Sequence, residues 1–236
     1  MKLPLSTRLA ACCSFVKPGA RIADIGCDHG YLGIYLLKNG IANAVIAADI
    51  HQQPLNSAYH NAHKFGVADK IRFYLSDGAA NIARDFDTMV CAGMGADTII
   101  SILSAAPWLK SDQYSLILQC QSKLPQLRRY LSQEGYCITE ETVLRDGRFL
   151  YTVMKVIYRP GTPLTSGQCY FPPAMLRNCS PLTAQYYQRV LAKLTHIVTN
   201  RKQIDSAITD AYNEVKALAA QPAFAWLKEE NHDDCK

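Results

Sequence analysis

The sequence predicts an α/β fold in which a parallel sheet with crossover helices is followed by a separate helical segment. Three observations support this prediction. Over residues 1–159, apolar runs typical of buried strands alternate with segments of helical spacing, as in a parallel sheet. Two strand-like stretches then surround Asp146-Gly147, which is a hairpin signal. Beyond residue 181, apolar residues recur every three or four positions.

The first region opens with an expected helix at about Leu5 to Phe15, which the Lys17-Pro18-Gly19 break should end. Five buried strands are then expected, in the runs ARIADIG (20–26), NAVIAADI (43–50), IRFYLSD (71–77), FDTMVCAG (86–93) and YSLILQC (114–120). The intervening segments have helical spacing. Each predicted strand ends in small or polar residues, and an open α/β sheet binds its ligand at that edge.

The hairpin over residues 137–159 completes the first region. Five parallel strands followed by a hairpin is the chain order of class I, Rossmann-like methyltransferases. We therefore expect a Rossmann-like domain at residues 1–159, a proline-rich connector at 160–181 and a helical coiled-coil domain at 182–236.

The helical tail has a heptad-like pattern, which fits either one long helix or a helical hairpin. Its stepped positions hold Tyr187, Val190, Leu194, Ile197, Arg201, Ile204, Ile208, Ala211, Val215 and Leu218. Basic residues lie near its centre, at Arg189, Lys193, Arg201 and Lys202. The tail could bind RNA or form a homodimer through the coiled coil.

Composition excludes several classes of protein. The net charge of +5 permits a polyanionic partner without requiring one. Nine cysteines without a Cys-x-x-Cys spacing fit neither a disulfide framework nor a zinc site, so we expect free thiols in a reducing compartment and no metal. No apolar stretch approaches the roughly 18 residues of a membrane span, and we expect a cytoplasmic protein.

The turn after the first strand, ADIGCDHGYLGIYL (23–36), resembles a nucleotide-binding loop with one difference. Asp28 stands where a dinucleotide-binding loop has its second glycine, and its carboxylate would repel a pyrophosphate. S-adenosylmethionine carries a sulfonium and an ammonium group instead, which carboxylates attract. The pattern Asp24-x-Gly26-x-x-x-Gly30 therefore favours S-adenosylmethionine over NAD, although a strand-to-helix turn that binds nothing has the same outline.

Two more acids end consecutive strands. Asp49 follows Gly30 at the spacing at which an acid binds ribose hydroxyls, and Asp77 is placed to accept from an adenine amino group. Each acid alone could be a helix cap, but three in order favour a methyltransferase. After the fourth strand, Met94 could cover the adenine, and Asp97 should cap the next helix.

The motifs LSTRLAACCSFVKPGARIADIGCDHGYLGIYL, AADI, SDGA, CAGMG, LILQ and DGRFLYTV resemble, in this order, those of the bacterial tRNA (adenine(22)-N1)-methyltransferases, the TrmK family. The resemblance runs from about Leu5 to Tyr158, and the helical tail agrees with the family's C-terminal domain. Two departures are Ala96, where a second glycine is usual, and Cys120-Gln121, where Pro-Asn is common.

The resemblance implies methylation of N1 of adenosine 22 in tRNA, with S-adenosylmethionine as the cofactor. The implied cofactor-binding residues are Asp24, Gly26, Gly30, Asp49, Ile50, Asp77, Gly78, Ala92, Gly93 and Met94. Asp28 is the predicted catalytic residue, because a carboxylate accepting from the adenine N6–H would stabilise the charge that develops on the ring. Arg8, His29, Tyr31 and Gln119 are candidates to hold the base. We expect Lys123, Arg128 and Arg129 to face solvent.

Three alternatives stay open at this point. A small-molecule methyltransferase of the same fold would have a closed pocket and no affinity for RNA. A nicotinamide-dependent oxidoreductase conflicts with Asp28 in the turn and with the terminal hairpin. A non-catalytic binding module, with a degenerate first domain and a coiled coil that assembles partners, conflicts with the intact acids at 24, 49 and 77.

Overall fold

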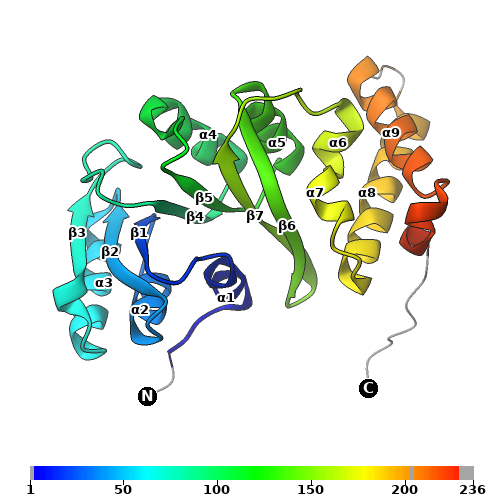
Figure 1. The fold of residues 1–236 in the computed structure, drawn as a ribbon. Coiled ribbons are helices and arrows are strands. Elements are labelled where there is room, and N and C mark those ends of the chain that lie inside the picture. The colour runs from blue at the N-terminus through cyan, green and yellow to red at the C-terminus, as the bar shows by residue number, and fades with distance from the viewer. Residues whose placement is uncertain (1–2, 202, 204, 229–236) are drawn as a thin grey trace, which may run out of the picture.

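The computed structural model describes residues 3–201, 203 and 205–228 (Figure 1). Within these residues one mixed sheet of seven strands has the order β3-β2-β1-β4-β5-β7-β6. Its strands are β1 (Ala20–Ile25), β2 (Ala42–Asp49), β3 (Ile71–Leu75), β4 (Thr88–Met94), β5 (Ser115–Cys120), β6 (Tyr136–Asp146) and β7 (Phe149–Tyr158). The first five run parallel, and β7 lies antiparallel between β5 and β6. The Rossmann-like α/β fold is therefore confirmed.

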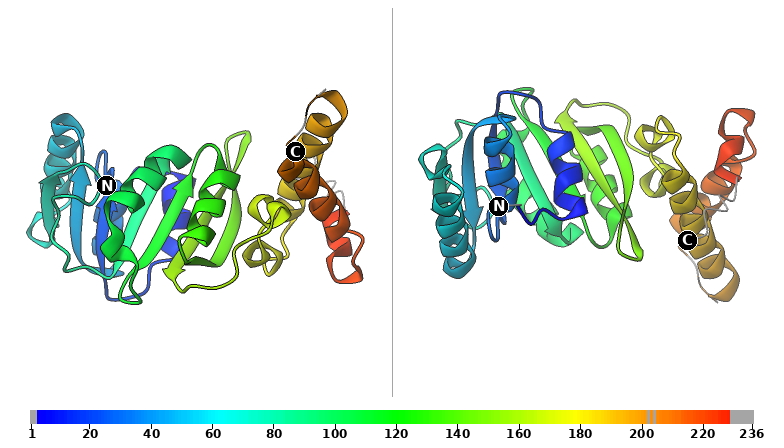
Figure 2. Two further views of the ribbon diagram at one scale, coloured as in Figure 1. Left: turned by 90° about the horizontal axis from the view of Figure 1, so that it is seen from above. Right: turned by 90° about the horizontal axis from the view of Figure 1, so that it is seen from below.

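Helices cover both faces of the sheet, as the views of Figure 2 show. One face packs against α1 (Thr7–Ser14), α2 (Tyr31–Lys38) and α3 (Gln52–Lys64), and the other against α4 (Ala96–Ala105) and α5 (Leu124–Gln133). Short 3₁₀ turns lie at η1 (Ala68–Lys70) and η2 (Pro107–Leu109). Successive strand residues alternate between the two cores, so Ile22 faces α2 while Ala23 faces α4. This double burial is why the strands are continuously apolar.

The strand order reverses between β1 and β4. The chain runs from β1 outward through β2 to β3 and then returns to β4 on the other side of β1. Open α/β sheets bind ligands at this switch point, beyond the carboxyl ends of the strands. Helix α1 contacts β4, β5, β6 and β7 and so closes one side of that edge.

The segment expected as a connector contains two short helices, α6 (Ser166–Tyr170) and α7 (Pro173–Leu176). Thr165 and Gln168 form a capping box that starts α6. Prolines begin α7 and the following α8 (Pro181–Asn200), because proline is compatible with the first turn of a helix. The prolines of this segment therefore initiate helices as well as separating them.

The heptad-like tail forms a helical hairpin. Helix α8 ends at Asn200, and α9 (Ser206–Leu218) begins after Asp205, whose side chain accepts from the N–H of Ala207 at 3.0 Å. The Tyr187 hydroxyl near the start of α8 donates to the Val215 carbonyl near the end of α9 at 3.1 Å, so the two helices are antiparallel. A 3₁₀ segment, η3 (Pro222–Lys228), packs on α8.

The apolar heptad positions pair the two helices of one chain with each other. Tyr187, Val190 and Leu194 on α8 and Ala211 and Val215 on α9 are buried in one cluster. The predicted position Arg201 falls in the break between the helices and is exposed. The predicted positions Ile204 and Lys202 lie outside the described residues.

Arg128 is fully buried, so the expectation that it faces solvent was wrong. Its guanidinium donates to the Glu141 carboxylate of β6 at 2.6 Å and to the carbonyls of Cys169 and Tyr170 at 3.0 and 2.8 Å. Both charged side chains have 0% exposure. The two carbonyls end α6 and have no partner within that helix. Arg128 therefore joins α5, the sheet edge and the C-terminal helices.

The other two predicted surface cations are exposed, but Lys123 has a partner. Its ammonium lies 2.6 Å from the Asp97 carboxylate. Asp97 was expected to cap α4, yet Gly95 is the N-cap and no side chain caps that helix. The carboxylate turns toward the start of α5 instead. Among the described helices, none is long and apolar enough to cross a membrane.

We expect Arg128→Ala to lower the free energy of unfolding by about 3–5 kcal/mol, because it leaves the Glu141 carboxylate buried without a counter-charge. Urea denaturation measures the change. Arg129→Ala is the matched control: Arg129 is the exposed neighbour on the same helix, and its removal should change the stability by less than about 0.5 kcal/mol. Equal effects of the two variants would contradict the assigned role of Arg128.

Candidate active site

A cavity of about 590 Å³ lies at the switch point. The carboxyl ends of β1 and β4 form its floor, and α1 with the residues before it forms a wall. Its lining includes the predicted site residues Arg8, Asp24, Gly26, Asp28, His29, Tyr31, Ala92, Gly93, Met94 and Gln119. Residues far apart in the sequence are thus brought together at the edge where the fold class places its ligand.

The floor of the cavity is made of small residues. Gly26 has a φ of +70°, and a Cβ there would lie 2.3 Å from the Met94 Cε. Gly93 has a φ of +81° and is exposed. Only glycine adopts these angles without strain and leaves the space beside Met94 open. The backbone at both strand ends can therefore lie directly against a ligand.

Asp24, the last polar residue of β1, is a buried acid in this cavity. Its exposure is 4%. Burial raises the pKa of the Asp24 carboxyl from 3.8 to about 7; a backbone hydrogen bond from Gly33 opposes the rise, and the Asp49 carboxylate adds to it. A carboxylate held in this way gains stability from any cationic group that enters the cavity.

Asp49 fixes the conformation of the turn that carries Asp28. One Asp49 carboxylate oxygen accepts from the backbone N–H of Asp28 at 3.2 Å, and the other accepts from that of His51 at 3.0 Å. The side chain is nearly buried at the end of β2 and does not line the cavity. Each oxygen keeps a further lone pair, so the predicted bond to a ribose stays open to Asp49.

Asp28 has a left-handed backbone conformation, with a φ of +49°. Such angles are uncommon outside glycine, and they cluster at functional sites. The conformation directs the carboxylate outward, and its side chain is 70% exposed. The His29 Nε2 lies 3.7 Å from this carboxylate, and the His29 and Tyr31 rings lie 5.7 Å apart. These three residues form the accessible rim of the cavity.

Arg8 connects α1 to the hairpin. Its Nε donates to the Asp146 carboxylate at 2.8 Å, and its guanidinium carbon lies 5.0 Å from the centre of the Tyr151 ring. Asp146 is at the hairpin turn, where the sequence showed only a turn signal. Arg8 is therefore a wall residue that is held in place, and its predicted contact with the base stays a prediction.

Gln119 lines the cavity, but its amide is bonded to the backbone. Its Oε1 accepts from the N–H of Gly93 at 3.0 Å, and its Nε2 donates to the carbonyl of Cys120 at 3.3 Å. With 0% exposure it holds the ends of β4 and β5 together, and its predicted contact with the base stays a prediction. Gln121 is exposed and lines the cavity as well. The one signal for Gln121 in the sequence is its place in the unusual Cys120-Gln121 pair.

Five predicted cofactor residues lie outside the cavity lining, Asp49 among them. A Cβ on Gly30 would lie 2.9 Å from the Ala58 Cβ, and one on Gly78 would lie 2.8 Å from Ile102. Both glycines therefore permit close packing in this structure. Ile50 and Asp77 are exposed at the ends of the neighbouring strands β2 and β3, and their contacts with a cofactor stay predictions.

Cysteines near the cavity are neutral thiols. The described cysteines are free, and burial raises the pKa of Cys91 to about 12. Cys27, in the lining, is also buried, and its pKa is raised by burial and by the acids around it. Among the residues that the structure describes, no group of three or more histidines, cysteines or acids is placed to hold a metal.

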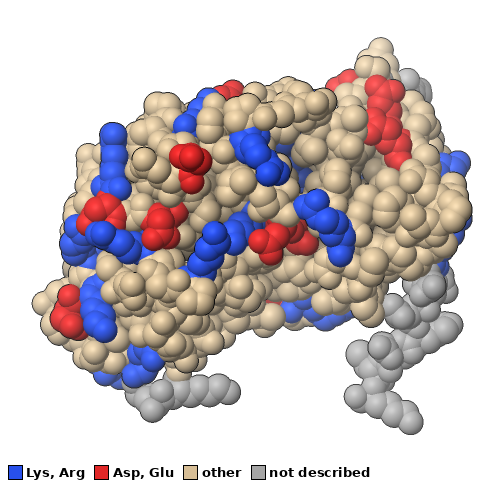
Figure 3. Space-filling model, in the orientation of Figure 1, with Lys and Arg blue, Asp and Glu red and all other residues tan. Residues whose placement is uncertain are grey.

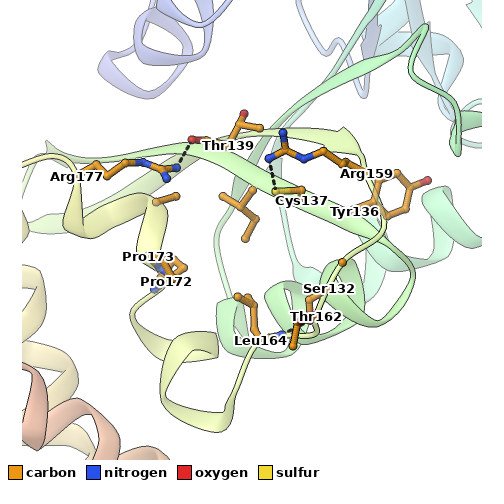
Figure 4. Close-up of a pocket in the computed structure, with 13 residues that line it drawn as sticks. Ser132, Tyr136, Cys137, Thr139, Arg159, Thr162, Leu164, Pro172, Pro173 and Arg177 are labelled. Carbon is orange, nitrogen blue, oxygen red and sulfur yellow. Dashed lines mark hydrogen bonds between the residues drawn. The ribbon is translucent and has the colours of Figure 1, made fainter.

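A second cavity, of about 470 Å³, lies at the opposite edge of the sheet, beside the start of β6 (Figure 4). Its two arginines are bonded to the protein. Arg177 donates to the Thr139 carbonyl at 2.6 Å, and Arg159 to the Cys137 Sγ at 3.4 Å. This cavity is a seam between the sheet edge and the segment around α7, distant from the carboxyl ends of the strands.

Comparison with known proteins agrees with this geometry. A sequence model described as a methyltransferase domain matches residues 5–154. The chain is 33% identical over 154 residues to the tRNA (adenine(22)-N(1))-methyltransferase of Bacillus subtilis. It is similar to the crystal structure of the B. subtilis m1A22 tRNA methyltransferase TrmK, with a TM-score of 0.75, 26% identity and coverage of 96% of this chain and 98% of that one.

A third similarity includes a bound cofactor product. The structure of Mycoplasma capricolum TrmK in complex with S-adenosyl-homocysteine has a TM-score of 0.73 and 25% identity, and covers 90% of this chain and 95% of that one. In sequence, the chain spans less than two thirds of the length of two curated relatives. It spans 65% of the B. subtilis enzyme and 61% of a putative tRNA methyltransferase of Mycoplasma genitalium. The structural match to the B. subtilis enzyme covers 96% of this chain and therefore extends into the C-terminal helices.

The raised pKa of Asp24 predicts a pH-dependent stability. The folded chain holds the Asp24 proton up to about pH 7, and the unfolded chain releases it near 3.8. The raised pKa therefore does not affect the stability below about pH 3.8, and it destabilises the fold progressively as the pH rises from there to about 7. We expect Asp24→Asn to gain about 1–3 kcal/mol relative to the original protein between about pH 5 and pH 8.

Urea denaturation of the ligand-free protein at the two pH values measures this difference. Asp112→Asn is the control, because Asp112 is exposed in a turn far from the cavity. The assignment fails if Asp24→Asn shifts the stability equally at both pH values.

Proposed function

We propose that this chain methylates N1 of adenosine 22 in tRNA with S-adenosylmethionine. The chain belongs to the methyltransferase domain family and, within it, to the TrmK tRNA methyltransferases. The observation that carries the proposal is the pair of carboxylates in the switch-point cavity, Asp24 buried and Asp28 accessible. These acids lie in and beside the turn after β1. A loop that binds phosphate offers backbone N–H groups at this place and no carboxylate. The ligand they favour carries positive charge.

The cavity residues fit S-adenosylmethionine. The Asp24 carboxyl is buried, and an ammonium group beside it would favour its ionised form. The Gly26 and Gly93 backbones leave room for the ligand. Asp49 ends β2 and Asp77 follows the end of β3, at the edge of the sheet where ribose hydroxyls and the adenine amino group would be bound. When bound, the cofactor supplies an electrophilic methyl group.

Asp28 is the residue that we assign to the acceptor base. N1 of adenine has a lone pair of its own, so transfer needs alignment more than a strong base. Methylation makes the ring cationic and its N6 protons more acidic. The Asp28 carboxylate can accept from N6–H and stabilise that charge as it develops. Asp49 holds the Asp28 backbone, so the carboxylate is positioned before the substrate arrives.

The base must leave its paired or stacked position, because N1 lies on its Watson–Crick edge. His29 and Tyr31 stand on the rim beside Asp28 and are the rings best placed to receive a displaced base. Arg8 forms the opposite wall. The apolar residues between α8 and α9 are buried within one chain. We therefore propose that the C-terminal helices bind RNA and do not form a homodimer. Its tRNA substrate would place the enzyme in the cytoplasm.

Site-resolved analysis of methylated tRNA tests the function. A tRNA with adenosine at position 22 should acquire one methyl group there from labelled S-adenosylmethionine, and primer extension should stop at that nucleotide. The same tRNA with guanosine at that position should stay unmethylated. Methylation at another nucleotide, or of neither tRNA, would reject the proposed reaction.

Asp28→Asn should separate catalysis from cofactor binding. Asparagine tolerates the left-handed conformation and keeps the shape of the side chain, but it removes the charge. We expect kcat to fall by roughly 10²-fold or more, while the dissociation constant of S-adenosylmethionine from calorimetry changes little. Asp112→Asn should alter neither value. Loss of cofactor binding with a normal rate in the bound enzyme would move Asp28 to the cofactor pocket.

A further inference from the structure

A third cavity, of about 500 Å³, lies between the β6–β7 hairpin, the loop after β5 and helix α8. We call it the hairpin groove. Its cations are Lys123, Arg189 and Lys193, and its exposed aromatic ring is Phe149. No aspartate or glutamate is among its lining residues. The groove therefore combines positive charge with aromatic surface.

The hairpin groove adjoins the active-site cavity. Gln121 lines both. Arg8 lines the active site and stacks at 5.0 Å on Tyr151, which lines the groove. The two cavities thus share a wall, and a chain molecule with one residue in the active site can continue into the groove.

Phe149 is the feature of the groove that packing within the chain leaves unexplained. It follows the hairpin turn, and its exposure is 51%. The Arg148 guanidinium lies 5.0 Å from the centre of its ring. Exposed phenylalanine beside cations is typical of surfaces on which nucleic acid bases stack. Single-stranded nucleic acids are bound through such rings together with backbone contacts to lysine and arginine.

Charge is mixed on one face of the molecule. In the face shown in Figure 3, lysine and arginine side chains are interspersed with aspartate and glutamate. The net charge of the chain is only +5. A polyanion is therefore better held by a local surface without acids than by the whole face. Arg189 and Lys193 are four residues apart on α8, so they lie on one side of the helix and both line the groove.

We propose that the hairpin groove binds the RNA nucleotide next to the target adenosine, with its base stacked on Phe149 and its phosphates near Arg189 and Lys193. The proposal rests on the proposed function, because it takes the target base to be in the active-site cavity. Displacing that base removes a stacking partner from its neighbour. The Phe149 ring replaces the lost partner, and the two cations bind the backbone that has been distorted.

The test uses the full-length protein and its tRNA with 2-aminopurine in place of each nucleotide adjoining position 22 in turn. Binding to the original protein should change the fluorescence at one of these positions, and Phe149→Ala should abolish that change. Phe149→Ala should also raise the apparent KM for tRNA roughly tenfold with an unaltered dissociation constant for S-adenosylmethionine. Phe149→Tyr keeps the ring and should restore the KM to about twice the original value or less.

The cations are tested separately. Replacing both Arg189 and Lys193 by alanine should weaken tRNA binding. It should also reduce the magnitude of the negative slope of log affinity against log salt concentration by about 1.4, because two phosphate contacts are lost. Lys70→Ala is the control, since Lys70 is exposed at the amino end of β3, on the far side of the sheet. Thermal melting checks that each variant is folded.

Each outcome bears on one proposal. The groove is rejected if Phe149→Ala and the double variant bind tRNA as Lys70→Ala does, even when methylation at position 22 is normal. If the original protein does not methylate tRNA, the function fails. In that case, a fluorescence change that depends on Phe149 would still support an RNA-binding groove, and its absence would reject the groove as well.

Discussion

The buried ion pair between Arg128 and Glu141 holds the C-terminal helices to the sheet. Removing two charges from water is costly, and the cost is offset here by a short contact between them and by the carbonyls of Cys169 and Tyr170. Because Arg128 of α5 needs its partners on both β6 and α6, it fixes the positions of these three elements relative to one another. Helix α8 follows α6 and α7, so its place beside the hairpin depends on the same contacts.

A second constraint arranges the active site. The Asp49 carboxylate binds the backbone of the turn and holds Asp28 in a conformation that few non-glycine residues adopt. Asp24 is buried at the end of the adjacent strand, and Asp28 is exposed in the turn. Burial raises the pKa of Asp24. The two carboxylates of one motif therefore suit different tasks: the buried one suits a cationic ligand in the cavity, and the exposed one suits a base at its rim.

The sequence predicted what depends on local order and failed where distant contacts decide. Strand runs, the hairpin at Asp146-Gly147 and the acids at strand ends follow from periodicity and from the direction of parallel strands. Arg128 shares the helix face of Leu127 and Leu131, whereas Arg129 does not. The sequence does not show the partners on β6 and α6 that allow a charge to be buried on that face. Gln119 could be placed at the site, but its bond to Gly93 depends on the pairing of β4 with β5.

These constraints connect at Arg8. Its guanidinium is bonded to Asp146 and stacked on Tyr151, so α1, which closes the active site, is attached to the hairpin that forms one side of the groove. The other side is α8, which the buried ion pair keeps in place. A nucleotide in the groove would therefore press on the same hairpin that holds the active-site wall. The C-terminal helices, although distant from the transferred methyl group, thus contribute to the surface that would align the base beside Asp28.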